Sequence, residues 1–310
     1  DVGKMDRLPN TTGMKNEVVV QGGHRNAYDH GLRMAGITFV EVGYLGYPGA
    51  GGTFAWQLEE AITERTAAIA CPILDTPGTL TLTEVAEIGR KHGIPVIVDA
   101  AATLPPRSNL KRFIAEGADL VTYSGGKAIK GPQASGVLAG RRDLIASVAL
   151  QHQDMDVRAE TWAKRGLLGE RAVAGIPHQG FGRAMKVGRE EAVGLITALK
   201  RFAAGSDEAD AARWNVQLDM IESALDGIPA TRVERKMGAK QPIPMLDIVI
   251  DEQALGRSAY QVLNELIEGD PAIAIAESRA EFGIITVNPH SLCDDEIPVV
   301  ARRLREVLTK

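Results

Sequence analysis

A lysine and an aspartate stand at chemically useful places in this sequence. Lys127 follows an apolar run and a Ser-Gly-Gly turn, and a second run of small residues, 135–140, comes directly after it. Asp99 ends the apolar run 94–99 and precedes Lys127 by 28 positions (127 − 99). An amine that forms a Schiff base and a carboxylate that keeps a ring nitrogen protonated are the groups that pyridoxal-phosphate chemistry requires. We therefore predict that Lys127 carries pyridoxal phosphate and that Asp99 contacts its ring nitrogen.

Both residues also have plain structural interpretations. A lone lysine is usually a solvated surface residue, and Asp99 could cap the turn that follows its strand. A lysine between two apolar strands should instead face a crevice, where desolvation lowers the pKa of its amine. Lys130, on the same segment, is the second choice for the cofactor lysine.

The surrounding pattern predicts an α/β fold. Short runs that are apolar at every position are separated by segments with the apolar spacing of helices. This order is typical of a parallel sheet covered by helices on both faces. We expect strands at 17–21, 38–42, 67–71, 94–99 and 119–123, and helices at 27–35, 53–62, 83–92, 110–116 and 141–153. Ligands of such sheets bind beyond the carboxyl ends of the strands, where both candidate residues lie.

The C-terminal part has a different order. After an irregular connection from 154 to 181 we expect helices at 186–204, 208–225, 258–267 and 295–308 and strands at 231–235, 245–250, 272–276 and 283–287. That order predicts a small α+β domain. We therefore divide the chain into a large cofactor-binding domain (1–185), bridging helices (186–225) and a small C-terminal domain (226–310).

Two further residues are candidates for binding the cofactor. Ser124 lies three positions before Lys127, so its hydroxyl could donate to the cofactor phosphate or simply complete the turn. His24 follows Gly22 and Gly23 at a strand–helix junction. Its imidazole could stack on the cofactor ring or meet the substrate, and it could equally be an ordinary loop histidine.

Four more residues are candidates for binding the substrate. Arg183 and Lys186 lie just before a predicted helix and after the long irregular connection, where long loops are often functional. We expect them to hold an anionic group, although solvated charges beside an acidic pair would look the same. Gln133 and His178 are weaker candidates for substrate contacts.

Composition limits the classes of partner. The chain has 310 residues, 24% charged and 45% hydrophobic, with a net charge of −5, which argues against a broad basic face for nucleic acid. Two cysteines are too few for a disulfide framework, and no apolar run approaches about 20 residues. We expect a cytoplasmic protein with no membrane span and no metal.

The segment 124–136, Ser-Gly-Gly-Lys-Ala-Ile-Lys-Gly-Pro-Gln-Ala-Ser-Gly, resembles the lysine segment of the bacterial selenocysteine synthases, the L-seryl-tRNA selenium transferases. That family usually has Ser-Gly-Asp-Lys, so Gly126 replaces an acid here. The resemblance spans roughly 17–199 and includes 183–188, which is similar to the family's substrate-anion segment. Without a visible tRNA-binding domain, the chain is most similar to the shorter relatives such as D-glucosaminate-6-phosphate ammonia-lyase.

The resemblance implies a fold and an assembly. It implies fold type I of the pyridoxal-phosphate enzymes (aspartate aminotransferase-like), with a mainly parallel sheet, and a homodimer or larger. Such enzymes often bind the substrate carboxylate with a small-domain arginine; strand 272–276 offers none, and Arg279 is the nearest substitute. They also place a glycine-rich phosphate site ahead of the first strand, and residues 1–16 contain none. We therefore expect the large domain to lack its N-terminal part.

The expected reaction is α,β-elimination with ammonia release from a β-hydroxy amino acid or amino sugar acid, with or without a phosphate. The alternatives are selenium transferase-like β-replacement on seryl-tRNA, and racemisation or aldol cleavage, which need the same lysine and acid. A third alternative is a non-catalytic relative that keeps the fold for binding.

Overall fold

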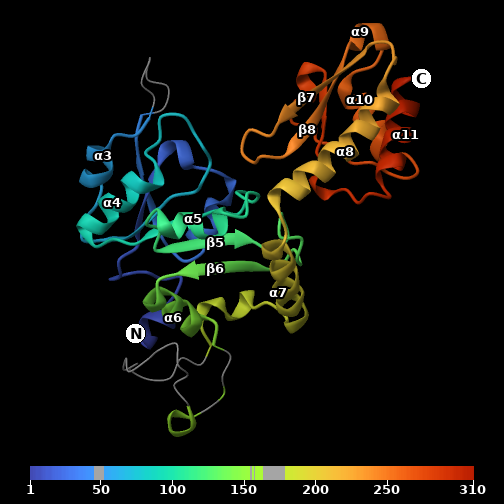
Figure 1. The fold of residues 1–310 in the computed structure, drawn as a ribbon. Coiled ribbons are helices and arrows are strands. Elements are labelled where there is room, and N and C mark those ends of the chain that lie inside the picture. The colour runs from blue at the N-terminus through green and yellow to red at the C-terminus, as the bar shows by residue number, and fades with distance from the viewer. Residues whose placement is uncertain (45–51, 154–155, 157, 163–178) are drawn as a thin grey trace. The chain divides into compact units, whose positions relative to one another are not determined.

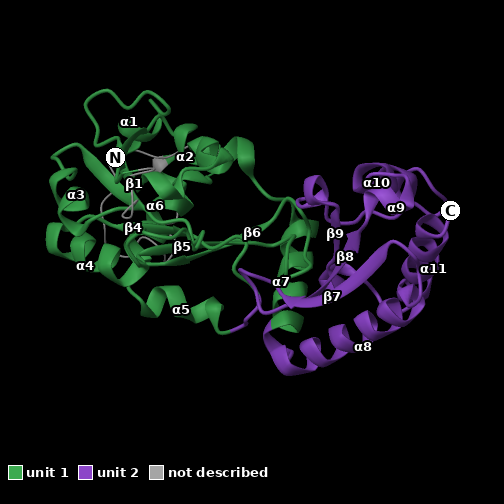
Figure 2. Cartoon of the chain, turned by 90° about the horizontal axis from the view of Figure 1, so that it is seen from above, with its two compact units in different colours: residues 1–104, 108–202 green, residues 105–107, 203–310 purple. Residues whose placement is uncertain are grey.

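A computed structural model describes residues 1–44, 52–153, 156, 158–162 and 179–310 (Figure 1). The chain forms two compact units (Figure 2). Unit 1 comprises Asp1–Leu104 and Ser108–Phe202, and unit 2 comprises Pro105–Arg107 and Ala203–Lys310. The boundaries predicted for the functional domains stay a prediction.

Unit 1 contains a six-stranded sheet in the order β2-β1-β3-β4-β5-β6. Its strands are β1 (Glu17–Gln21), β2 (Thr38–Val42), β3 (Thr66–Ala70), β4 (Val96–Asp99), β5 (Leu120–Ser124) and β6 (Gly136–Gly140). All neighbouring pairs are parallel except β5 and β6, whose arrows run in opposite directions in Figure 1. The predicted mainly parallel α/β sheet is confirmed.

Helices cover this sheet because its strands bury side chains on both faces. Val19 packs into one core with side chains of α3, α4, α5 and α7, whereas Val18 and Val20 pack into a second core that Leu32 of α2 closes. Alternate residues of one strand thus reach opposite faces. The helices of unit 1 are α1 (Val2–Met5), α2 (His30–Arg33), α3 (Ala55–Glu60), α4 (Leu82–His92), α5 (Asn109–Ala115), α6 (Arg142–Gln151) and α7 (Arg189–Ala204).

Local signals set the ends of α4. Thr81 caps its first turn in a capping box with Glu84, and Gly93 ends it in the left-handed conformation with φ of 67°.

Short 3-10 turns complete the unit: η1 (Gly22–His24), η2 (Ala27–Asp29), η3 (Ala159–Thr161) and η4 (Phe181–Met185). The helix predicted over 27–35 is therefore shorter than expected. The side chain of Asn26 accepts a hydrogen bond from the Tyr28 amide and starts a 3-10 turn before α2.

Unit 2 packs four helices against a three-stranded antiparallel sheet in the order β7-β8-β9. Its elements are β7 (Thr231–Met237), β8 (Pro244–Ile250), β9 (Ile284–Val287), α8 (Asp207–Leu225), α9 (Glu252–Leu255), α10 (Ala259–Ile267) and α11 (Ile297–Leu308), with 3-10 turns η5 (Ala280–Phe282) and η6 (Pro289–Ser291). Leu246 and Ile248 of β8 and Ile285 of β9 are fully buried in its core.

The predicted strand 272–276 is wrong. Only Ala276 pairs with the sheet, through an isolated bridge to Thr286. The alternating apolar residues that suggested a strand, Ile273 and Ile275, pack against the core of unit 2 without a strand ladder. A backbone hydrogen bond from Ile273 to Leu266 holds the segment against the end of α10 instead.

In the part of the chain that the structure describes, no helix is both long enough and apolar enough to cross a membrane.

Candidate functional site

The lysine loop connects β5 to β6 and is held by its own backbone. The Gly125 amide donates to the Ser135 carbonyl at 2.9 Å, and the Gly131 amide donates to the Gly125 carbonyl at 2.8 Å. Ala128 and Ile129 are buried in the sheet's core and anchor the loop from beneath. The loop is therefore a fixed platform for Lys127.

Glycine is required at the position before the lysine. A Cβ on Gly126 would lie 2.6 Å from Gln133 Oε1 and 2.8 Å from Gln133 Cα. The backbone of Gln133 thus occupies the space that the acid of the resembling family would need. Gln133 itself is exposed, and its Nε2 lies 3.5 Å from the Gly126 carbonyl.

The amine of Lys127 is available for reaction. Its Nζ lies 5.9 Å from the centre of the Tyr28 ring and makes no hydrogen bond or ion pair with the residues described. The side chain is exposed, so the expectation of a desolvated lysine is not met within this chain. The physical reason is that Lys127 lies in the turn beyond the end of β5, with the exposed Tyr28 ring near its amine.

Asp99 lies beside this loop at the carboxyl end of β4. Its strand pairs with β5, Asp99 opposite Thr122, and the next amide, that of Ala100, donates to the Thr122 carbonyl at 3.0 Å. Asp99 Oδ1 accepts a hydrogen bond from the Ala101 amide at 2.9 Å. Asp99 Oδ2 has no partner among the described residues, which leaves one carboxylate oxygen for a ligand. Sheet topology thus places Asp99 next to the strand that carries Ser124 and leads to Lys127.

Ser124 ends β5 opposite Gly136 of β6 and is half-buried. Its hydroxyl makes no hydrogen bond to a described residue, so it is available to an anion.

Cys71, which follows β3, is a buried core residue. Burial raises the pKa of its thiol to about 12, so it is not a thiolate at neutral pH.

His24 follows β1 and is 4% exposed. Its Nδ1 is completely buried without a hydrogen-bond partner within the described chain. Burial lowers the pKa of this imidazole below its usual value, and the Asp75 carboxylate opposes the shift only in part. His24 is therefore neutral at pH 7, and it lines a cavity of about 460 Å³.

The candidate substrate residues are placed elsewhere in unit 1. Arg183 lies in η4, which packs against α6, and Lys186 follows directly after η4 and is exposed. His178 lies outside the described residues. The structure therefore brings Asp99, Ser124, Lys127 and Gln133 together through β4, β5 and the lysine loop, and places Arg183 and Lys186 on a separate segment.

Tyr28 was missed by sequence reasoning. Its ring is 79% exposed and lies near the Lys127 amine, on a segment braced by ion pairs from Arg25 to Asp29 at 2.6 Å and to Glu41 at 2.5 Å. The spacing along the chain carries no signal for this contact, because it joins the segments after β1 and β5. Arg279, the nearest substitute for a carboxylate-binding arginine, forms an ion pair with the buried Asp247 in unit 2.

The polar groups at this edge of the sheet fit pyridoxal phosphate. The cofactor needs a free amine for its aldehyde and an anionic oxygen for its ring nitrogen. Lys127 Nζ and Asp99 Oδ2 are such atoms, and neither is held by a hydrogen bond from another described residue. His24 adds a neutral aromatic ring whose buried Nδ1 has no hydrogen-bond partner among the described residues.

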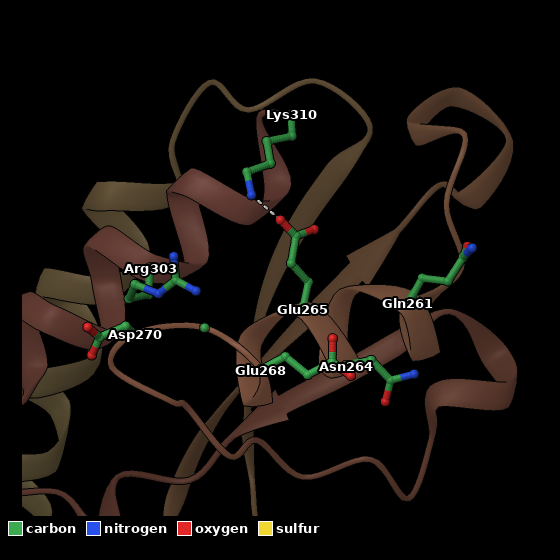
Figure 3. Close-up of a pocket in the computed structure, with 8 residues that line it drawn as sticks. Gln261, Asn264, Glu265, Glu268, Asp270, Arg303 and Lys310 are labelled. Atoms are coloured by element: carbon green, nitrogen blue, oxygen red, sulfur yellow. Dashed lines mark hydrogen bonds and ion pairs between the residues drawn. The ribbon is translucent and has the colours of Figure 1, made fainter.

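A second cavity, of about 580 Å³, belongs to unit 2 (Figure 3). Charged side chains of α10 and α11 surround it, and Glu265 forms an ion pair there with Lys310. None of the residues predicted from the sequence lines this cavity, so it is not part of the candidate site.

Comparisons with known proteins find a matching family model and similar sequences. Residues 18–160 match the family model of L-seryl-tRNA selenium transferase. The chain is 31% identical to a 5'-C-glycyluridine monooxygenase-decarboxylase of Streptomyces sp, over 98% of this chain and 70% of that protein. It is 30% identical to the D-glucosaminate-6-phosphate ammonia lyase of Salmonella typhimurium, over 99% and 74%.

A solved structure of a protein with one of these functions has a similar fold. The structure of a D-glucosaminate-6-phosphate ammonia-lyase is similar to this one with a TM-score of 0.78 and 29% sequence identity, covering 99% of this chain and 75% of that chain.

Proposed function

This chain belongs to the selenocysteine synthase-like family of fold type I pyridoxal-phosphate enzymes that includes D-glucosaminate-6-phosphate ammonia lyase, and on that premise we propose its reaction. We propose that it eliminates the β-hydroxyl of an amino acid or amino sugar acid and releases ammonia. The observation that carries this proposal is that Lys127 Nζ and Asp99 Oδ2, at or just beyond the carboxyl ends of adjacent strands, both lack a hydrogen-bond or ion-pair partner among the described residues. Because the chain is an enzyme, the alternative of a non-catalytic relative is set aside.

Lys127 has two roles in this reaction. Its Nζ would hold the cofactor and, once released, would take the proton from the substrate's Cα. The protonated amine then gives a proton to the departing β-hydroxyl, which leaves as water. When bound, pyridoxal phosphate supplies the electron sink that accepts the electrons of the broken Cα–H bond. The unsaturated amine released at the end adds water and splits into a keto acid and ammonia.

Asp99 supports this chemistry through its free oxygen. Oδ2 would accept a hydrogen bond from the cofactor's ring nitrogen and keep it protonated, while the Ala101 amide fixes Oδ1 and so orients the carboxylate. Ser124 would donate to the cofactor phosphate, and His24 would contact the cofactor ring.

The remaining candidates bind the substrate. Arg183 and Lys186 hold its anionic group, and Gln133 and His178 contact its polar atoms. Support for Arg183 and Lys186 comes from their charge and from the resemblance of segment 183–188 to the family's substrate-anion segment.

Ammonia release is preferred over the related reactions on two grounds. The ammonia-lyase structure is similar along nearly the whole chain, and the net charge of −5 does not favour a seryl-tRNA substrate. Racemisation and aldol cleavage use the same lysine and acid, and the experiment below separates them by product. We further propose a cytoplasmic homodimer or larger assembly with a small anionic substrate and no nucleic-acid partner.

The test is a product assay. D-glucosaminate 6-phosphate, D-glucosaminate and D-serine are each incubated with the pyridoxal-phosphate-loaded protein, and ammonia and keto acid are measured. We expect equal amounts of both products from at least one substrate, none with Lys127→Ala, and retained activity with the neighbouring control Lys130→Ala. An isomerised substrate, an aldehyde product, or a thioether formed with added thiol but no ammonia would contradict the proposal.

A further inference from the structure

The cavity beside His24 has no role in the chemistry described so far. It lies between the segment 71–83, which comprises the connection from β3 to α4 and the first two residues of α4, and the side chains of α5. Its volume of about 460 Å³ is within the range of small-molecule sites. The residues that matter for recognition are Thr76, Thr79, Thr81, Thr83, Asp75 and His24.

Specific hydrogen bonds build this cavity. The side chain of Gln21, at the end of β1, accepts from the Leu80 amide at 2.6 Å and donates to the Leu80 carbonyl at 3.2 Å. The hydroxyl of Thr76 donates to the Gly23 carbonyl at 2.9 Å. These contacts tie the segment 71–83 to the segment that carries His24, so the wall is preformed.

His24 indicates that the cavity binds a ligand. Buried polar groups in proteins are nearly always hydrogen bonded, and a buried group without a partner lowers stability. The Nδ1 of His24 is buried without a partner within the described chain, and the residue is 4% exposed and lines the cavity. A ligand that supplies hydrogen bonds would satisfy it.

The charges in the cavity decide which ligand fits. Arg112 is its cation, and that guanidinium is already paired with Glu116 at 2.6 Å. The carboxylate of Asp75, which is exposed and has no partner among the described residues, adds a negative charge. A phosphate would meet repulsion there, whereas hydroxyl groups can donate to Asp75 and exchange hydrogen bonds with His24 and with threonine hydroxyls.

The cavity adjoins the strand end that carries Asp99. Ile73 lines it, and the amide of Ile73 donates to the Asp99 carbonyl at 3.0 Å. We propose that the cavity beside His24 is the subsite for the neutral, hydroxyl-bearing carbon chain of the substrate. This proposal rests on the proposed function and deepens it, because it places the hydroxylated chain here and the substrate's anionic group elsewhere.

The experiment measures binding and turnover separately. His24→Phe keeps an aromatic ring for the cofactor and removes both ring nitrogens, Thr83→Val removes a cavity hydroxyl with little change of shape, and Thr197→Val is the matched control on α7. Saturation-transfer NMR detects binding of D-glucitol, a neutral hexitol, to the cofactor-loaded proteins, with inorganic phosphate as competitor. KM is then compared for D-glucosaminate and for D-serine, which lacks the chain.

We expect wild type and Thr197→Val to bind D-glucitol without competition from phosphate, and both cavity variants to bind it at least about five-fold more weakly. In Thr83→Val, which changes a residue with no role toward the cofactor, KM should rise by about the same factor for D-glucosaminate and stay unchanged for D-serine. No binding of D-glucitol to wild type, displacement by phosphate, or equal effects on both substrates would overturn the subsite. Binding by wild type without ammonia release from either substrate would overturn the proposed function while leaving a polyol site.

Discussion

A substitution of Asp99 can test catalysis separately from the covalent attachment of the cofactor to Lys127. Its free oxygen is assigned to the cofactor's ring nitrogen, and an amide in its place would not keep that nitrogen protonated. We expect Asp99→Asn to retain the covalently bound cofactor and to lose about 100-fold or more in kcat, as expected for a residue that controls protonation at the reacting group. The absorption spectrum and the rate of ammonia release are measured on the same sample.

Asp226→Asn is the matched control, because Asp226 is exposed and lies at the end of α8. An Asp99→Asn variant as active as this control would contradict the role of Asp99 at the cofactor's ring nitrogen.

His24 predicts a dependence of stability on pH. Burial lowers its pKa in the folded state below the ordinary value of 6.5, so the unfolded chain binds a proton more readily. The free energy of unfolding should therefore fall as pH decreases from 6.5, by at most about 1.4 kcal/mol per pH unit for this one group. The loss ends at the folded-state pKa.

The measurement is urea unfolding at pH 7.5 and pH 5.5 of wild type and His24→Phe. The variant lacks the titrating ring, so its stability should change less between the two pH values than that of wild type. Equal changes would show that His24 does not hold its neutral form in the fold.

At the scale of elements, the lysine loop depends on glycine more than its exposure suggests. A Cβ on Gly126 would meet the backbone of Gln133 at 2.8 Å, so a new side chain cannot be accommodated by a rotamer change alone. Gly126→Ala should lower the free energy of unfolding by about 1–3 kcal/mol and weaken cofactor binding. Gly31→Ala, where a Cβ meets nothing within 4 Å, should do neither.

Thermal unfolding and cofactor titration check this pair of variants. If Gly126→Ala were as stable as Gly31→Ala and bound the cofactor equally well, the close approach of Gln133 would have no consequence for the site.

The sequence predicted the place of a residue in the fold correctly where that residue directly follows an apolar strand. The apolar runs before Asp99 and Lys127 place both residues at the carboxyl edge of a parallel sheet, and β4 and β5 are neighbours in it. It failed at 272–276, where alternating apolar residues pack without a ladder. It also missed Tyr28 and the cavity beside His24, because those contacts join distant segments through turns that carry no periodic pattern.

At the scale of the whole molecule, self-association is the property to test. Tyr44, Phe54 and Trp56 of unit 1 are each about half exposed, and fold type I relatives are expected to pair. We expect a mass in solution of at least twice that of the 310-residue chain, and Trp56→Glu to shift the protein toward monomer. Tyr260→Glu, at an equally exposed aromatic residue of unit 2, is the control and should leave the mass unchanged.

Multi-angle light scattering at micromolar concentration gives the mass. A monomeric wild type would contradict the predicted assembly. Equal effects of the two substitutions on the mass would show that Trp56 has no specific part in the subunit interface.

The central claim is that Lys127 carries pyridoxal phosphate. The most direct measurement is borohydride reduction of wild type, Lys127→Ala and Lys130→Ala, each loaded with pyridoxal phosphate, followed by peptide mass mapping. We expect one reduced adduct on Lys127 in wild type and in Lys130→Ala, and none on this loop in Lys127→Ala. An adduct on Lys130 in wild type, or no adduct at all, would contradict it.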